Sequence, residues 1–486
     1  MGTDSNTSKW WDGLRRAVPC DAALAVLVLQ PLLFLLVLPL QPTFDDWTYL
    51  TSPHPGNFDI SLFLPDTYWR PFDALLGYVL GRYPALFPTL NHVIILLLHL
   101  ANTLLTASIA RRLGFSRRAT DVTTLFFFLS PGMLGTVLDI DSMNQAAALM
   151  WGLTAIFLSL GTQKHRLWMC MALLLSILSK ENGLAFIVII PLLLYVFRRR
   201  SGQQAVAIAG PLIAVGMAYL VLRLSLPHSH ADLSDTAGVY LQGGLTQRLR
   251  NIGMYLGFSW VPVDFVGLLH APSRKIVFIV ATLVAGLPLL VITAWRSGRH
   301  LLDREVIGLL LCSLVAVSIH LATIFTVMHT YAGLPFIALI MGYLHRYAGK
   351  GNEYLLAFLL WIACVMMVGL RHAIKAEASG RIGASMARKV LKQSTKESDR
   401  VLVVIIEDSA PHYSMFCVRP SDAFGWGLAV RHATNYQWPD SIDNTFINDD
   451  NATKTDSIAQ DALSQGYDAV WIVKKNKVFV KEGGIR

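Results

Sequence analysis

Residues 22–47 read AALAVLVLQPLLFLLVLPLQPTFDDW, and this stretch decides the class of fold. Its apolar part, 22–40, carries no charge, and a helix of about 20 apolar residues crosses a bilayer. It is longer than the apolar core of a signal peptide and no small-x-small cleavage site ends it, so we expect a retained span. The pair Asp45-Asp46 therefore falls at a membrane surface. Carboxylates are costly to hold there, which makes the pair a candidate for function.

The rest of the chain has the composition of a polytopic membrane protein. Of its 486 residues, 54% are hydrophobic and only 15% are charged, a balance with which a soluble protein cannot cover its surface. A further stretch at 252–269 is apolar but interrupted by Trp260, Pro262 and Asp264, and we expect it to lie in the interface or re-enter it. About eleven spans are predicted: 22–40, 89–109, 119–137, 143–160, 167–180, 184–197, 204–224, 275–295, 305–326, 331–346 and 353–371.

The net charge of +9 indicates orientation rather than nucleic-acid binding. The basic residues stand in short clusters between apolar stretches, such as Arg111-Arg112 and 198–200, as the positive-inside rule describes. With eleven spans all these clusters fall on one side, which places the N-terminus in the cytoplasm. The acidic pair then lies on the extracytoplasmic or lumenal face. We expect a multi-pass protein of the bacterial inner membrane or the endoplasmic reticulum.

The chain changes character after the last span. We expect a transmembrane domain at 1–375, with a large first outer loop at 41–88, and a small extracytoplasmic α/β domain at 376–486. In the latter the pattern predicts a strand at 401–406, a helix at 456–465 and a hairpin at 469–480. The fold class is thus an all-α membrane protein with a small C-terminal α/β domain. The five cysteines are scattered, and their spacing supports neither a zinc site nor a disulfide framework.

Two of the polar motifs lie in the first outer loop. Asp45-Asp46 could cap a helix, but one Asp would suffice for that, so a general base or a metal-binding pair is favoured. Arg70 follows Tyr68 and Trp69. Its planar guanidinium suits a lipid phosphate, although Trp and Arg also collect at interfaces as anchors.

Other polar residues fall inside or between later spans. His92 and His99 share one face of an apolar helix, where hydrogen bonds between helices are the favoured interpretation. Lys180-Glu181 forms a turn between two short spans and can offer a point charge to a phosphate. Asp139 and Asp141 make a second acidic outer loop. Tyr331 opens a late span, where anchoring at the interface is the more usual role.

Taken in order, these motifs resemble those of the GT-C superfamily of membrane glycosyltransferases. The likeness is to the protein O-mannosyltransferases and their tetratricopeptide-bearing relatives, and it covers about residues 20–270. The chain departs from that pattern at Ile95, where the family has Asn, and at Thr330, where it has Arg. No tetratricopeptide array follows. The matching elements are the pair Asp45-Asp46, Trp69-Arg70-Pro71, His92 with His99, and Leu178-Ser179-Lys180-Glu181.

The resemblance implies transfer of a sugar, with inversion, from a polyprenyl-phosphate donor to an hydroxyl of a protein or glycan. It implies that Asp45 is the general base and that Asp46 orients the acceptor or supports a divalent ion, Mg²⁺ or Mn²⁺. Arg70 and Lys180 would stabilise the leaving phosphate. The remaining candidates for the substrate pocket are Asp139, Asp141, His92, His99, Glu181 and Tyr331.

Two other functions stay open at this stage. A transporter or lipid flippase would also need intramembrane His and Lys residues, but it would more often show repeated halves with broken spans in matching positions. The sequence shows no such internal repeat. A non-catalytic member that presents its C-terminal domain is the third alternative.

Overall fold

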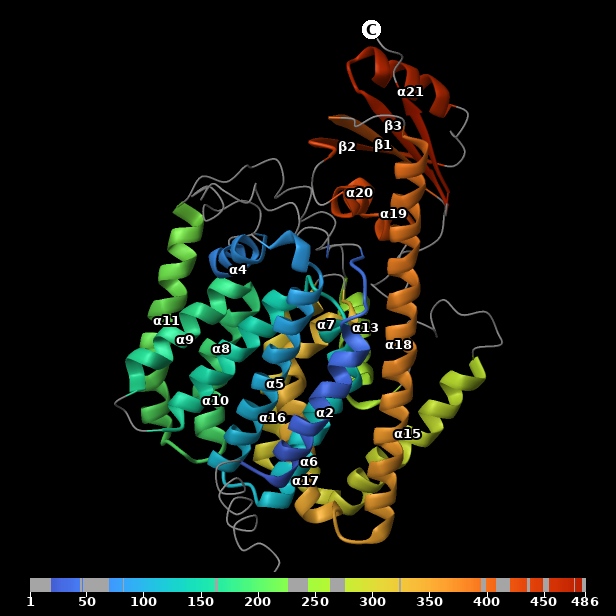
Figure 1. Cartoon of the computed structure of the whole chain (residues 1–486). Coiled ribbons are helices and arrows are strands. Elements are labelled where there is room, and N and C mark those ends of the chain that lie inside the picture. The colour runs from blue at the N-terminus through green and yellow to red at the C-terminus, as the bar shows by residue number, and fades with distance from the viewer. Residues whose placement is uncertain are drawn as a thin grey trace, which may run out of the picture.

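The computed structural model describes residues 19–43, 46, 70–81, 83–161, 165–225, 244–262, 276–322, 325–394, 399–407, 420–434, 438–448, 454–475 and 477–482. Asp45, Tyr68 and Trp69 lie outside these ranges. The described membrane portion is helical (Figure 1). Its helices are α2 (Asp21–Val37), α4 (Pro71–Gly81), α5 (Thr89–Arg112), α6 (Arg117–Leu129), α7 (Leu134–Val137), α8 (Met143–Ser159), α9 (Arg166–Ser179), α10 (Phe186–Val196), α11 (Gly202–Ser225), α13 (Leu245–Trp260), α15 (Ile276–Ser297), α16 (Arg304–Leu321), α17 (Leu334–Ala348) and α18 (Asn352–Gln393).

The length and composition of these helices are those of an integral membrane protein. Five described helical segments are long and apolar enough to cross a bilayer. The most enclosed of them is Val327–Ala348, in which the turn η9 (Val327–Gly333) leads into α17 and 89% of the apolar window is buried. It forms the centre of the bundle. The total of eleven spans stays a prediction.

One predicted span and one predicted interfacial segment differ from what the structure shows. The span expected at 119–137 is broken after α6 into a short turn, η4 (Pro131–Met133), and α7, because Pro131 has no N–H to continue the helix. The helix expected at 252–269 is α13, which begins at Leu245 and ends at Trp260. Its end is explained by Pro262, since Val261 before it is extended, as the residue preceding a proline prefers. Residues 263–269 lie outside the described ranges.

The C-terminal part is built on a four-stranded sheet of order β2-β1-β3-β4. The parallel strands β1 (Arg400–Glu407), β2 (Ser441–Asn448) and β3 (Ala469–Lys474) are joined by β4 (Lys477–Glu482), which is antiparallel to β3. The predicted strand, hairpin and helix, α21 (Thr455–Ser464), are confirmed. Strand β2 and the short helices α19 (Pro420–Ala423) and α20 (Leu428–Ala433) were not predicted. The sequence of β2, SIDNTFIN, has too few apolar residues to show a strand pattern.

Helix α18 connects the bundle to the sheet. It is 42 residues long, which corresponds to about 63 Å at a rise of 1.5 Å per residue, about twice the thickness of the bilayer core. Figure 1 shows it (orange) running beside the bundle and on to the strands. Its last residue holds the edge of the sheet, because the Gln393 side chain donates to Val478 O and accepts from Val480 N at 3.3 and 3.1 Å. The expected boundary between 375 and 376 falls within this helix.

The upper part of α18 passes close to two other segments. A Cβ at Gly380 would lie 2.5 Å from the Gln41 Cβ, and a Cβ at Gly383 would lie 2.0 Å from the Ala423 carbonyl oxygen. A third contact joins the membrane bundle directly to the C-terminal part. Phe87 packs edge-on against His432, with ring centroids 5.6 Å apart. The C-terminal part is therefore packed against the segments that flank the first outer loop.

We expect Gly383→Ala to destabilise the packing of the C-terminal part on α18. The added methyl group would meet backbone of α19, which cannot rotate away as a side chain can. Overpacking of this kind costs about 1–3 kcal/mol. Limited proteolysis should then cleave the chain between α18 and β1 faster than in the wild type. The matched control is Gly210→Ala, where the added methyl group meets open space; equal cleavage of both variants would contradict the expectation.

Candidate functional site

Asp46 anchors the end of the α2 segment to the loop before α8. Its carboxylate accepts the backbone N–H of Thr43 at 3.0 Å and the backbone N–H of Asp141 at 3.1 Å. It also shares a hydrogen bond with the Asp139 side chain. The residue is only 3% exposed. Since both oxygens already accept hydrogen bonds from the chain, Asp46 positions this part of the site.

Asp46, Asp139 and Asp141 lie together, although 95 positions separate Asp46 from Asp141 in the sequence. Asp139 is buried and its carboxylate accepts the hydroxyl of Ser142 at 3.1 Å. Burial raises the pKa of Asp141, and the positive charges of Lys180 and Arg70 partly offset this rise. Asp141 therefore lies between the other two aspartates and the basic residues Lys180 and Arg70. Asp45 precedes the anchored Asp46 and lies outside the described residues.

The basic side of the site is organised by Glu181. Its carboxylate receives Arg70 in a bidentate pair, with Nη2–Oε2 at 2.8 Å and Nε–Oε1 at 3.1 Å. Arg223, near the end of α11, lies on the other side with Nη1 at 3.5 Å from Glu181 Oε1, and it donates to the Tyr219 hydroxyl at 3.1 Å. One carboxylate thus fixes two guanidinium groups. Arg223 was not among the residues singled out in the sequence.

Lys180 is held at the tip of the α9–η6 turn. The turn η6 (Glu181–Ala185) packs so closely on α9 that a Cβ at Gly183 would lie 2.5 Å from the backbone carbon of Ser176. Lys180 is only 5% exposed. The turn is thus sunk into the bundle.

Two stacked histidines lie next to the basic side. His320 of α16 and His329 of η9 lie face to face, with ring centroids 4.0 Å apart and an interplanar angle of 8°. The charges of Lys180 and Arg70 act on both rings. His329 Nδ1 accepts the Thr326 backbone N–H at 3.1 Å, which leaves Nε2 to carry the proton in the neutral ring. In the sequence, His320 falls inside the predicted span 305–326 and His329 lies just before the span at 331–346, so no local pattern connects the two.

Three of the predicted pocket residues serve the bundle instead. His99 bonds the Tyr331 hydroxyl through Nδ1 at 2.8 Å and Phe128 O through Nε2 at 3.2 Å. Asn102 also donates to the Tyr331 hydroxyl, at 3.2 Å. His92 is buried beside Leu40. These contacts hold α5 to its neighbours, which agrees with the interpretation that the sequence favoured for the two histidines.

The described residues do not by themselves supply a metal site, and Asp45, the other predicted ligand, lies outside them. Across the described ranges no three His, Cys, Asp or Glu side chains are placed to hold a cation. Asp46, expected to supply a ligand to Mg²⁺ or Mn²⁺, already accepts two backbone N–H groups. No step of the proposed chemistry is therefore routed through a metal.

We expect the stability of this region to fall with rising pH. Burial raises the pKa of Asp46 to about 6, from an ordinary value of 3.8. The folded state therefore favours the protonated carboxyl, so its stabilisation is complete below about pH 4 and is lost as the pH rises through about 6. In Asp46→Asn this part of the pH dependence should disappear. Thermal unfolding in detergent at several pH values measures it; identical profiles for the two proteins would contradict the expectation.

No protein-family model matches the chain, and no curated protein matches it. Among solved structures it is similar to the oligosaccharyltransferase AglB of Archaeoglobus fulgidus. The complex of AglB with an inhibitory peptide and a dolichol-phosphate matches at 13% identity and a TM-score of 0.46, over 93% of this chain and 69% of that one. The form tethered to an acceptor peptide matches at 14% identity and a TM-score of 0.43, over 84% of this chain and 63% of that one. In the second comparison the chain thus spans less than two thirds of the protein it matches.

Proposed function

We propose that the protein is an integral-membrane glycosyltransferase that moves a sugar from a polyprenyl-phosphate donor to an hydroxyl of a protein or glycan. The observation that carries this proposal is the polar cluster itself. Three carboxylates, Asp46, Asp139 and Asp141, meet Lys180 and the Arg70–Glu181 pair near the end of a membrane bundle. A sugar-phosphate donor and an hydroxyl acceptor need these two kinds of group side by side.

The acidic half suits activation of the acceptor. An hydroxyl is a weak nucleophile at neutral pH, and a positioned carboxylate that takes its proton contributes about 10²–10⁴-fold to the rate. Asp46 is committed to backbone N–H groups, so we assign the role of base to its neighbour Asp45. A single base that acts opposite the leaving group gives inversion at the sugar without a covalent intermediate.

The basic half suits the leaving phosphate. Arg70, Arg223 and Lys180 stand against the single carboxylate of Glu181, so this side of the site carries net positive charge. Fixed cations stabilise charge that develops on a leaving oxygen without having to reorganise. The bond from the sugar to the phosphate oxygen breaks as the acceptor oxygen attacks, and the base takes the acceptor proton. The active site on the extracytoplasmic or lumenal face is part of this proposal.

The proposal is tested by following both products of the reaction. Purified protein in liposomes would receive radiolabelled polyprenyl-phosphate sugars, each with a Ser/Thr peptide or an oligosaccharide as the acceptor. We expect label in the acceptor and release of polyprenyl phosphate, both dependent on the acceptor. Movement of the labelled lipid across the bilayer without release of phosphate would instead identify a flippase and overturn the proposal.

A further inference from the structure

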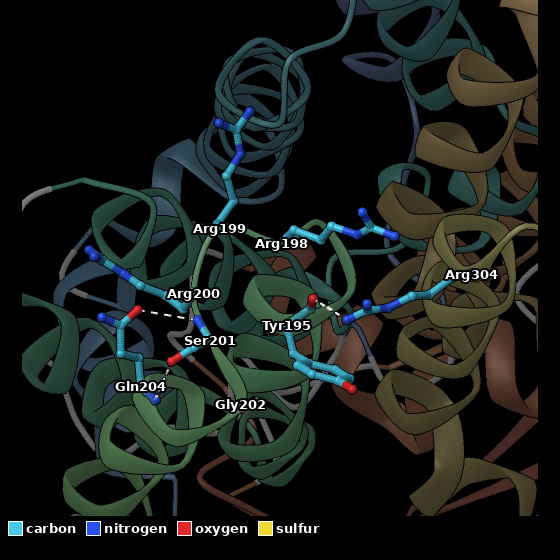
Figure 2. Close-up of a pocket in the computed structure, with 8 residues that line it drawn as sticks. All are labelled: Tyr195, Arg198, Arg199, Arg200, Ser201, Gly202, Gln204 and Arg304. Carbon is cyan, nitrogen blue, oxygen red and sulfur yellow. Dashed lines mark hydrogen bonds between the residues drawn. The ribbon is translucent and has the colours of Figure 1, made fainter.

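A second polar site lies where α10 turns into α11. It is a pocket of about 430 Å³ whose lining, over the described part of the chain, includes four arginines and no acidic residue. The lining residues are Tyr195, Arg198, Arg199, Arg200, Ser201, Gly202, Gln204 and Arg304 (Figure 2). The basic clusters of the chain indicate orientation in the membrane, but they do not require four arginines to share one hollow. We propose that this pocket binds the phosphate of an anionic phospholipid headgroup.

The backbone at the pocket is held in a conformation that arginine disfavours. Arg198 has φ +52, the left-handed region that glycine usually supplies at the end of a helix. Its N–H donates to Tyr195 O at 3.0 Å, and the N–H of Arg199 donates to Leu194 O at 2.9 Å. This turn closes α10 and brings three consecutive arginines to the rim. An arginine in place of glycine at such a position points to a use for its side chain.

The arginines have few competing partners. Arg304 is fixed against Tyr195, because its guanidinium donates to the Tyr195 carbonyl and lies 4.0 Å from the centre of the ring. Arg200 donates to Gly161 O at 3.3 Å. Neither these two nor Arg198 and Arg199 form an ion pair with a carboxylate in the described ranges. Figure 2 shows Arg198 extending toward Arg304 on one side of the pocket. Guanidinium groups without carboxylates are suited to a phosphate.

The N-terminus of α11 does not account for the site. Ser201 and Gln204 cap each other, with Gln204 N–H donating to Ser201 Oγ at 3.3 Å and Ser201 N–H donating to Gln204 Oε1 at 3.2 Å. Some of the free amides of this terminus are therefore already satisfied. The attraction for an anion comes from the arginine side chains.

The surface beside the pocket indicates that the phosphate belongs to a lipid. On α11, Val206 and Ile213 are 72% and 50% exposed, and a spacing of seven residues places them on one face of the helix. Val188 on α10 is likewise exposed, two turns before Tyr195. An acyl chain can therefore lie along this apolar face while its headgroup enters the pocket. The pocket is also on the predicted cytoplasmic side, where anionic lipids attract basic residues.

The full-length protein tests this with three probes: phosphatidylglycerol, phosphatidylcholine and inorganic phosphate. We expect native mass spectrometry to show preferential retention of phosphatidylglycerol. In Arg198→Gly the affinity should fall roughly tenfold or more, because a charged hydrogen bond to the phosphate is lost. The unfolding temperature without lipid should not fall, since the φ of +52 at this position is one that glycine adopts freely. This separates loss of the site from loss of the fold.

Arg118→Gln is the matched control, because Arg118 is an exposed arginine of the same predicted cytoplasmic set that does not line the pocket. It should leave phosphatidylglycerol retention unchanged, and Arg304→Gln should weaken it as Arg198→Gly does. The proposal is overturned if the control variant loses as much affinity as Arg198→Gly, which would indicate diffuse charge. It is equally overturned if phosphatidylcholine is retained as well, or if inorganic phosphate binds and phosphatidylglycerol gains nothing over it.

Discussion

Replacing Asp45 by Asn is expected to lower kcat for sugar transfer by about 10²–10⁴-fold, the usual contribution of a general base. Asparagine keeps the size of the side chain and its hydrogen-bonding oxygen but cannot accept a proton from an hydroxyl. Binding of the donor should change little, because the basic residues around Glu181 are untouched. Initial rates at saturating donor and acceptor measure the effect.

Asp46→Asn is the control that tests whether Asp45, and not Asp46, is the base. Its side chain is committed to the amides of Thr43 and Asp141, so we expect a smaller fall in kcat together with a changed pH dependence of thermal stability. Asp45→Asn should unfold like the wild type. If instead Asp46→Asn abolished turnover at unchanged stability and Asp45→Asn remained active, the two roles would be exchanged and our assignment would be wrong.

Replacing Lys180 by Gln is expected to lower kcat by about 10²–10³-fold, the typical cost of losing one fixed group that stabilises transition-state charge. The lysine is buried at the tip of a tightly packed turn, where it cannot be replaced by solvent. Its charge also acts on Asp141. Two explanations of a loss therefore exist: the phosphate loses a cation, or Asp141 loses its neighbour.

A double-mutant cycle with Asp141→Asn separates these explanations. If Lys180 acts on the phosphate, Lys180→Gln should cost nearly the same factor in the wild type and in the Asp141→Asn background. If it acts only on Asp141, the cost should vanish in that background, and the proposed role for Lys180 would be wrong. Lys180→Arg, which keeps the charge, should recover part of the activity.

The helical bundle was predictable from the sequence because apolar stretches report helices directly. The break at Pro131 was less visible, since an apolar stretch that spans and one that folds back have the same composition. The shift of α13 has a similar cause: its first turns carry the polar residues Gln247, Arg248 and Arg250, which hydropathy assigns to a loop. Strand β2 depends on its neighbour β1 rather than on its own pattern.

The polar cluster was predicted in part. Arg70, Lys180 and Glu181 stood out because charge is rare beside apolar stretches, and the structure brings them to Asp141. Arg223 was missed because its partner Glu181 is 42 positions away and no local pattern connects them. The stacked pair of His320 and His329 arises from the packing of η9 against α16. His99 and Tyr331 resembled site residues because buried polar groups that hold helices together look the same in a sequence.

The unbroken course of α18 fixes more than the reach of the C-terminal part. Each residue added to an α-helix moves the rest of the chain by 1.5 Å along the axis and turns it by about 100°. Between Asn352 and Gln393, one inserted residue would swing the strands around the helix axis and away from Phe87. The number of residues in this helix therefore sets the direction in which the sheet faces. Insertions and deletions within α18 should be tolerated far less well than they would be in a flexible linker.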